Sequence, residues 1–204
     1  IRQRRDFVER YLDAAVDSDG RMRCAYDITG TRTGRLSSRQ SIYGSGTNLQ
    51  NIPSRRPEGE AIRRMFLADE GKVLVGRDYK QAEAWIVAYL ARCEPLIELF
   101  NDPSRDVHTE NAARIFGRKV PRLVGDGGDV TPEERYLAKR VIHASNYGMG
   151  EARLVQVVNE DSPYTNVRIS FNEAKQLMQK YFMMFPEIKE NFWKEVEREL
   201  RYSR

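Results

Sequence analysis

Two cations and two rings recur at intervals of four residues in the segment that begins at Thr131. They are Arg135, Lys139, His143 and Tyr147. In an α-helix, a step of four residues rises about 6 Å and turns about 40° past a full circle, so the four side chains would form one slowly winding stripe. From Arg135 to His143 the rise is roughly 12 Å, which is close to the reach of an extended nucleoside triphosphate. The spacing therefore predicts a helix that binds a nucleotide.

The start of this helix supports the same interpretation. Thr131 and Glu134 have the spacing of a capping box around Pro132, a residue favoured at the first helical position. The free N–H groups and the positive end of the helix dipole would then lie just before Arg135, where phosphate is favoured. An amphipathic surface helix, with solvated cations and half-buried rings, would show the same spacing. Other segments must decide between the two interpretations.

A carboxylate ends an apolar run earlier in the chain. Residues 72–79 read KVLVGRDY, which predicts a strand that ends at Asp78. A carboxylate on a rigid element suits Mg²⁺, which takes one or two protein carboxylates together with substrate phosphates. An ordinary strand-end or helix-capping aspartate fits the pattern too, and one carboxylate cannot hold two ions. Glu83 reads as a solvated or paired residue of the next helix.

Composition limits the class of protein. The chain has 204 residues, of which 40% are apolar, enough for one large or two small globular units. Lys and Arg number 34 against 30 Asp and Glu, but the first 64 residues are dense in arginine, as RQRR, RMR, RTGR and RR. Such a segment suits a polyanion such as nucleic acid, although arginines that only keep a surface soluble give the same pattern.

Cysteine, histidine and apolar patterning exclude several further classes. Cys24 and Cys93 are isolated, and His108 and His143 are the only histidines. This excludes a zinc finger or a disulfide framework and indicates a reducing compartment. The sequence has no run of about 18 apolar residues, and its Arg-rich start is not followed by an apolar core, so we expect neither a membrane span nor a signal peptide. We expect a cytoplasmic protein with no membrane segment.

Mostly helical elements must position these residues. Apolar periodicity and capping residues predict a full or partial helix over residues 1–20, and helices over 82–100, over 104–116 and from Thr131 to about 147. Two further helices, separated by Pro186, close the chain, and Ser170 and Glu173 cap the first of them. Weak alternation indicates a strand over Arg21–Ile28, and the polar composition of Thr29–Pro53 indicates a long functional loop. Asp17–Gly20 reads as a turn and Gly125–Asp129 as a flexible connector.

Five segments carry a family resemblance through their order: TRTGRLSS (Thr31–Ser38), NLQNIPSR (Asn48–Arg55), VGRDYKQAE (Val75–Glu83), DVHTE (Asp106–Glu110) and R-x3-K-x3-H-x3-YGMG (Arg135–Gly150). Together they resemble family A DNA polymerases, the DNA polymerase I type of bacteria and many bacteriophages. The similarity extends from about Cys24 to the final helices. It implies an α/β fold, as a fragment of a right-hand polymerase. Residues 1–100 would be a partial α+β palm with a duplex-contacting segment, and residues 101–204 a mostly helical fingers subdomain.

The resemblance also implies an activity, a cofactor and partners. The activity is template-directed DNA synthesis, in which a nucleotidyl group passes from a dNTP to a primer 3′-OH. Asp78 matches the aspartate that binds both catalytic Mg²⁺ ions, with the Tyr79 carbonyl as a further ligand. Lys139 matches the lysine that grips the phosphates and protonates the leaving pyrophosphate. The implied partners are dNTPs and primer–template DNA, bound by a monomer, and accessory replication proteins are not identified.

Two further groups of residues match positions with known roles in the family. The dNTP-binding positions are Arg135, Lys139, His143, Tyr147, His108, Gln81 and Glu83. Within this group, Arg135 and His108 match triphosphate-binding positions. Glu83 matches the glutamate that closes off the 2′ side of the sugar, in contact with Tyr147 at the template-base position. The residues that match duplex and minor-groove contacts are Arg35, Asn48, Gln50 and Asn51.

Three features depart from the family pattern. Position 143 is His where the family has Phe or Tyr, which puts sugar selectivity and stacking in doubt. The link Arg39–Thr47 is longer than usual, which puts the duplex contact there in doubt. The chain ends at Arg204, before any His-Asp-Glu segment with a second metal-binding aspartate. We therefore expect the chain alone to be inactive.

Two other functional classes are weighed against a polymerase. A noncatalytic nucleic-acid-binding module derived from a polymerase would keep the duplex contacts but would not need the triphosphate set, which includes Arg135 and Lys139. A metal nuclease would need several clustered carboxylates at a two-metal site, and the sequence does not show them.

Overall fold

The computed structural model describes residues 9–52, 57–120 and 128–202. The chain divides into two compact units, Ile1–Arg77 and Asp78–Arg204, which are described separately. The boundary expected between palm and fingers at residue 100 stays a prediction, and most of the predicted connector Gly125–Asp129 lies outside the described residues. No helix in the described ranges is long and apolar enough to cross a membrane.

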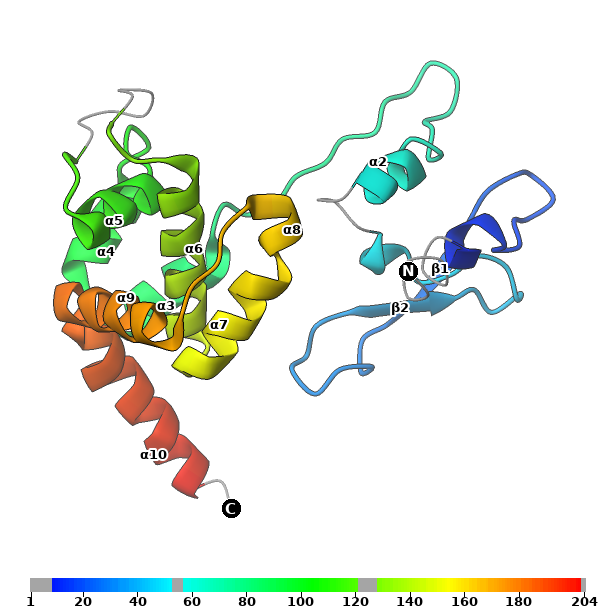
Figure 1. The fold of residues 1–204 in the computed structure, drawn as a ribbon. Coiled ribbons are helices and arrows are strands. Elements are labelled where there is room, and N and C mark those ends of the chain that lie inside the picture. The colour runs from blue at the N-terminus through cyan, green and yellow to red at the C-terminus, as the bar shows by residue number, and fades with distance from the viewer. Residues whose placement is uncertain (1–8, 53–56, 121–127, 203–204) are drawn as a thin grey trace. The chain divides into compact units, whose positions relative to one another are not determined.

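A short antiparallel sheet organises the first unit (Figure 1). Strand β1 (Cys24–Asp27) pairs with β2 (Ser37–Gln40), and the register sets Cys24 opposite Gln40. The 3₁₀ helix η1 (Leu49–Asn51) and helix α2 (Pro57–Arg63) follow. The strand predicted within residues 21–28 is confirmed in its second half, and the turn predicted over residues 17–20 is confirmed.

The prediction of one uninterrupted loop over Thr29–Pro53 is wrong, because β2 and η1 lie inside it. The sequence of β2 is SSRQ, which has no apolar alternation to indicate a strand. Its backbone pairs with β1, and an edge strand needs only the backbone groups of one neighbour. The polar side chains of this segment are therefore held on a strand.

The strand predicted to end at Asp78 is not formed. Val73, Leu74 and Val75 are 81%, 71% and 80% exposed, and residues 72–79 have no regular secondary structure. A strand requires partners for its backbone N–H and C=O groups. Within residues 9–52, 57–120 and 128–202, the two paired strands are β1 and β2, which pair with each other. The apolar run thus has no pairing partner in the described chain.

Helices make up the second unit (Figure 1). They are α3 (Ala82–Leu90), α4 (Glu94–Asn101), α5 (Val107–Phe116), α6 (Pro132–Asn146), α7 (Glu151–Glu160), α8 (Ser162–Thr165), α9 (Phe171–Met184), the π-helix η2 (Ile188–Trp193) and α10 (Lys194–Tyr202). The helices predicted around 104–116 and 132–147 are confirmed as α5 and α6. The predicted cap of α9 is confirmed as a reciprocal capping box of Ser170 and Glu173.

The single helix predicted over residues 82–100 is interrupted. Between α3 and α4, Arg92 has a φ of 54°, in the left-handed region where a right-handed helix cannot continue. The carbonyl of Ala91 accepts a 2.7 Å hydrogen bond from Asn191 Nδ2. Asn191 is 100 residues away in the chain, but Pro95 in the first turn of α4 is a local sign of the break, because proline disrupts a continuous helix and suits the first turn of a new one.

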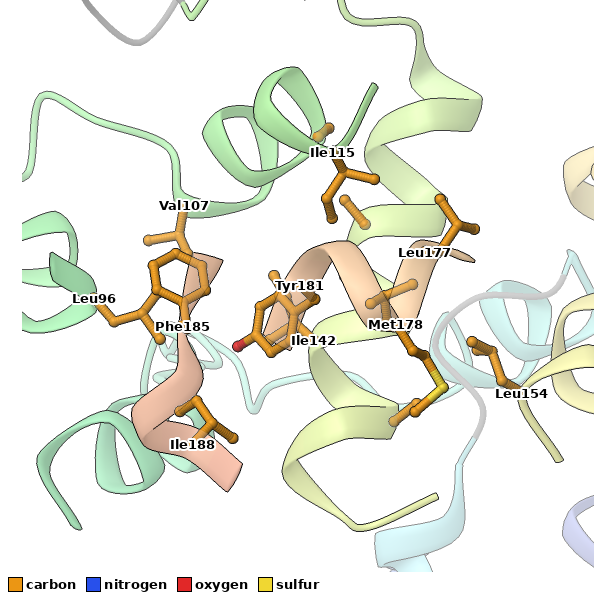
Figure 2. Packing of buried hydrophobic residues seen from close by; sticks show 14 of the residues in the cluster. Leu96, Val107, Ile115, Ile142, Leu154, Leu177, Met178, Tyr181, Phe185 and Ile188 are labelled. Atoms are coloured by element: carbon orange, nitrogen blue, oxygen red, sulfur yellow. The ribbon is translucent and has the colours of Figure 1, made fainter. Parts of the chain in front are cut away.

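The core of the second unit forms where α5, α6 and α9 pack together (Figure 2). The rings of Tyr181 and Phe185 meet edge to face, with centroids 5.3 Å apart. Both are fully buried, as are Ile115 and Ile188. Burying one such side chain stabilises a fold by about 1.5–3 kcal/mol. This core fixes one side of α6 and leaves its other side exposed.

Candidate nucleotide-binding site

Helix α6 presents the predicted stripe on its exposed side. Arg135, Lys139, His143 and Tyr147 are exposed. The rings of His143 and Tyr147 stack, with centroids 4.7 Å apart and planes 28° apart. Most of the residues that α6 buries are small or apolar, among them Ala138, Val141, Ile142 and Ala144. The stripe therefore consists of two cations followed by a stacked pair of rings, on a helix whose opposite side is held in the core.

Both ends of α6 are held by other elements. At its start the predicted capping box of Thr131 and Glu134 is confirmed. Arg118, which follows α5, donates to Glu134 Oε1 through Nε at 3.0 Å and through Nη2 at 2.8 Å. At its end, Trp193 Nε1 donates to the Ser145 carbonyl at 2.8 Å. These bonds fix the orientation of the stripe within the second unit.

Arg135 is bonded to the start of α5. Its Nε donates to Asp106 Oδ2 at 2.9 Å and to Thr109 Oγ1 at 3.1 Å, and its Nη2 donates to Asp106 Oδ1 at 3.3 Å. Asp106 is also the N-cap of α5, because its carboxylate accepts from the Thr109 backbone N–H at 3.1 Å. Burial raises the pKa of Asp106, but hydrogen bonds from Arg135 and Thr109 outweigh it and lower the pKa to about 2. The carboxylate is thus ionised and opposes the arginine charge.

His108 lies in the first turn of α5 and is only 7% exposed. Burial lowers its pKa to about 4; the Asp106 carboxylate opposes this shift, and the nearby cations Lys139, Arg135 and Lys80 add to it. The imidazole is therefore neutral near pH 7, with one N–H to donate. Its Nδ1 is buried without a hydrogen-bond partner among the described residues. A neutral donor thus lies within the field of three cations.

The predicted metal ligands Asp78 and Tyr79 lie in the exposed segment before α3, where Tyr79 is 88% exposed. The described residues contain no group of three or more His, Cys, Asp or Glu side chains placed to hold a metal ion. One carboxylate and one backbone carbonyl are too few protein ligands for two Mg²⁺ ions. These residues alone therefore do not fit a two-metal centre, and the Mg²⁺ assignment stays a prediction.

Gln81 and Glu83 lie where α3 begins. Gln81 is the residue before the helix and has φ 57° and ψ 32°. A side chain other than glycine rarely adopts this left-handed conformation, which costs on the order of 1–3 kcal/mol. Glu83 lies in the first turn of α3. Their roles at the dNTP stay predictions.

The predicted duplex contacts lie in the first unit, apart in sequence from the dNTP set. The Asn48 side chain caps η1, accepting from the Gln50 backbone N–H at 3.1 Å and from Ser38 Oγ at 2.6 Å. Its Oδ1 is thus used to join β2 to η1. Arg35, Gln50 and Asn51 are exposed. The structure brings these residues to neighbouring elements of one unit, and their contact with DNA stays a prediction.

Some arginines of the first unit are already paired with acids. Arg23 donates to Asp19 at 2.7 and 3.0 Å and also to Asp17. The hydrogen bond from Arg23 lowers the pKa of Asp19 to about 2. Arg21 donates to Asp69 at 2.5 Å. The arginine-rich sequence therefore overstates the positive charge that this part of the unit offers to a polyanion.

Residues 2–203 match the sequence pattern of DNA polymerase family A. The chain belongs to this family. Thermostable DNA polymerase I of Thermus aquaticus is 39% identical over 183 residues, and DNA polymerase I of Caldicellulosiruptor bescii is 36% identical over 184 residues. The matches cover 88% and 90% of this chain but 19% of each relative, so the chain spans about a fifth of their length.

The fold agrees with this membership. A solved structure, the POL domain of Pol1 from M. smegmatis in complex with DNA primer-template and dNTP, superposes with a TM-score of 0.72 at 34% identity. The likeness covers 96% of this family A chain and 30% of that structure. The family resemblance and the fold class predicted from the five sequence segments are confirmed.

Three residues of the family A chain that the sequence alone did not single out belong to the site. Asp106 and Thr109 hold Arg135, and Lys80 contributes to the charge around His108. Asp106 and Thr109 stand on either side of His108 in DVHTE, and Lys80 stands two residues after Asp78. All three residues lie close in sequence to predicted site residues, and this closeness is a signal. The hydrogen bonds of Asp106 and Thr109 to Arg135, and the effect of Lys80 on the pKa of His108, depend on how α5, α6 and the start of α3 pack.

Proposed function

We propose that this chain provides the dNTP-binding face and part of the primer–template site of a DNA polymerase. The reaction would transfer a nucleotidyl group from a dNTP to a primer 3′-OH. The observation that carries this proposal is the exposed stripe of Arg135, Lys139, His143 and Tyr147 on α6, which packs against α5 and its His108. The similar M. smegmatis domain, which is described in complex with primer-template and dNTP, supports it.

The arrangement suits the demands of phosphoryl transfer, which are mainly positioning and charge neutralisation. Arg135 and Lys139 would bind the phosphates, and His108 would donate its N–H to a phosphate oxygen. The stacked rings of His143 and Tyr147 lie farther along the same helix, where they would contact the base and the template position. Glu83 and Gln81 would border the sugar and the phosphates.

A triphosphate that binds in this way would meet an Arg135 that already has a partner. In the structure its guanidinium is bonded to the Asp106 carboxylate. A phosphate oxygen would replace Asp106 or share the guanidinium with it, because Arg has five N–H donors in a planar fork. The Asp106 carboxylate would thus compete with the substrate for Arg135.

Asp78 and the Tyr79 carbonyl are the residues that we propose to bind Mg²⁺. They would need ligands in addition to those of the described residues, since no group of three metal-binding side chains is present there. We therefore propose that the 204-residue chain alone does not extend a primer, and that Asp78 acts in the longer polymerase.

The main alternative is a noncatalytic module that binds nucleic acid. The exposed arginines Arg32 and Arg39 of the first unit favour it. The two functions differ in one respect: a module that binds only DNA gains nothing from a dNTP, whereas a polymerase site binds the complementary dNTP together with its template.

The test measures a complex of the chain with a primer–template whose primer ends in a dideoxynucleotide. Fluorescence anisotropy of the labelled DNA would give the dissociation constant with no dNTP, with the complementary dNTP and with a noncomplementary one. We expect tighter binding with the complementary dNTP only. Equal affinity under all three conditions would contradict the proposal and favour the noncatalytic module.

A matched pair of lysine variants distinguishes the loss of a specific dNTP contact from the loss of one positive charge. Lys139→Ala should remove the effect of the complementary dNTP. Lys175→Ala removes an exposed lysine of α9 and should keep the effect. If both variants behaved alike, the site would not be at α6.

A further inference from the structure

The turn that follows β2, Ser41–Gly46, carries an exposed apolar pair. Ile42 is 81% exposed and Tyr43 is 83% exposed. Single exposed apolar residues are common on protein surfaces, but these two are adjacent at the tip of one turn. The turn also lies within Arg39–Thr47, the link that we expect to be longer than usual for the family. Neither Ile42 nor Tyr43 is among the residues predicted to bind the dNTP, the metal or the duplex.

Hydrogen bonds define the shape of this turn. Ser41 N donates to the Ser45 carbonyl at 2.9 Å, and Gly44 N donates to the Ser41 carbonyl at 3.0 Å. The two serine hydroxyls are 2.8 Å apart, and Gln40 Nε2 donates to the Gly44 carbonyl at 2.5 Å. Gly44 has a φ of 79°, which favours glycine. The tip is thus held outward by a bonded frame.

The base of the turn is fixed to the rest of the first unit. Gly46 N donates to the Ala15 carbonyl at 2.6 Å. A Cβ at Gly46 would lie 1.7 Å from the Arg23 carbonyl oxygen, so only glycine allows this close approach. Ser45 is 6% exposed, and its hydrogen bond lowers the pKa of Asp17. A buried base and an exposed apolar tip indicate that the turn presents Ile42 and Tyr43 to something outside this unit.

The charge around the turn indicates the chemistry of that partner. Residues 28–56 contain five arginines and no Asp or Glu. Arg32, Arg35 and Arg39 of this stretch are exposed. Two carboxylates of other segments adjoin it, since Asp17 is hydrogen-bonded to Ser45 and Asp27 interacts with Arg39. A segment whose own charges are all positive, with an apolar tip, suits a polyanion that also offers apolar surface, as the sugars and base edges of a DNA duplex do.

We propose that the Ser41–Gly46 turn binds the primer–template duplex, with Ile42 and Tyr43 in the minor groove and the neighbouring arginines on phosphates. Apolar side chains are used in this way by proteins that bind the minor groove, and aromatic rings also stack on unpaired bases. The proposal rests on the proposed function, because it deepens the DNA contact expected at Arg35, Asn48 and Gln50. It adds two contacts that depend on apolar surface rather than on charge.

The test compares duplex affinity and its salt dependence by fluorescence anisotropy on the 204-residue chain. The double variant Ile42→Ser with Tyr43→Ser should weaken binding about tenfold with the same slope against salt, because it removes apolar contact and no charge. Arg39→Ala should instead lower the salt slope by about one. Tyr202→Ser, which changes a tyrosine of α10 that is 82% exposed, is the control and should bind as the unchanged chain does.

Each outcome decides between named possibilities. If the double variant binds the duplex as tightly as the Tyr202→Ser control does, the turn does not contact DNA, and the proposal is wrong while the proposed function stands. If the unchanged chain does not bind the duplex at all, the DNA part of the proposed function fails together with the proposal. If sedimentation shows that the double variant abolishes self-association while DNA affinity is unchanged, the tip serves a second copy of the chain and the proposal is wrong.

Discussion

Asp106 has two roles at the site, since it caps α5 and holds Arg135 through two hydrogen bonds. The first role needs only an oxygen acceptor, which Asn also supplies. The second depends on the negative charge. A substitution that keeps the acceptor and removes the charge can therefore separate the two roles.

We predict that Asp106→Asn binds dATP about two- to fivefold more tightly than the unchanged chain, because the carboxylate no longer competes for Arg135 or repels phosphate. Isothermal titration calorimetry at low salt would measure the change. Asp106→Ala is the control for the cap and should lose about 1 kcal/mol of unfolding free energy that Asp106→Asn keeps. Weaker dATP binding by Asp106→Asn would show that the ion pair positions Arg135 for the substrate.

His108 makes the stability of the second unit depend on pH. Its pKa is about 4 in the folded chain against an ordinary value of 6.5, so the unfolded chain takes up the proton first as the pH falls. The contribution of His108 to the free energy of unfolding is therefore fully present above about pH 6.5 and is lost as the pH falls toward 4. The loss amounts to about 3 kcal/mol. The lowered pKa of Asp106 changes the free energy of unfolding only at pH values below about 3.8, the ordinary pKa of that group. This range lies outside the interval from pH 4 to 6.5 in which His108 acts.

Urea unfolding at pH 7 and pH 4.5 would check the prediction. The tryptophans Trp85 and Trp193 both lie in the second unit, so their fluorescence reports its unfolding. The loss of unfolding free energy between the two pH values should be smaller in His108→Gln than in the unchanged chain. The same loss in both proteins would mean that His108 is not the group responsible.

At the level of elements, the packing of η2 against the end of α6 determines where Tyr147, the last residue of the stripe, lies. Gly148 follows Tyr147 with a φ of 60°, and a Cβ there would lie 2.6 Å from the Trp193 ring. The same tryptophan bonds the Ser145 carbonyl. The position of the Tyr147 ring therefore depends on close packing of a glycine against an indole.

We predict that Gly148→Ala destabilises the second unit by about 2–4 kcal/mol, since it combines backbone strain with overpacking. Gly117→Ala is the matched control, because its φ is 66° and nothing lies within 4 Å of a Cβ there. The control should lose only the strain component, about 1–2 kcal/mol. Thermal unfolding followed by circular dichroism would compare them, and equal losses would contradict the packing account.

The elements that the sequence predicted correctly are those with local causes. The capping box of Thr131 and Glu134 and the four-residue spacing that follows it depend on neighbouring residues, and both are present in α6. The strand predicted over residues 72–79 failed for a distant cause, because a strand needs a pairing partner. The break after Leu90 has a distant contribution from Asn191 and a local one from Pro95, whose signal the prediction of one helix missed. The polar strand β2 exists through its pairing with β1.

In the candidate site, too, some features follow from neighbouring residues and others from contacts between distant segments. The exposed stripe follows from helical spacing, so its four side chains could be predicted from the sequence. The ion pair of Arg135 with Asp106, over 29 residues, and the burial that lowers the pKa of His108 require the packing of α5 against α6. No periodicity encodes these contacts.

At the scale of the whole molecule, the chain holds two sets of predicted contacts in two units. The dNTP set lies in Asp78–Arg204 and the duplex set in Ile1–Arg77. The chain spans about a fifth of its family A relatives, and polymerization stays a proposal. Nucleotide binding, in contrast, can be measured on this chain, because the residues proposed for it lie within the second unit.

The most direct test of the α6 stripe is the preference of the chain for dATP over dAMP, measured by NMR titration in EDTA. If the stripe binds a triphosphate, dATP should bind at least about tenfold more tightly than dAMP, since the two cations bond the added phosphates. The double variant Arg135→Ala with Lys139→Ala should lose this preference, and Lys175→Ala with Arg201→Ala should keep it. Equal affinity of the unchanged chain for dATP and dAMP, or a preference that survives in the first double variant, would contradict the account.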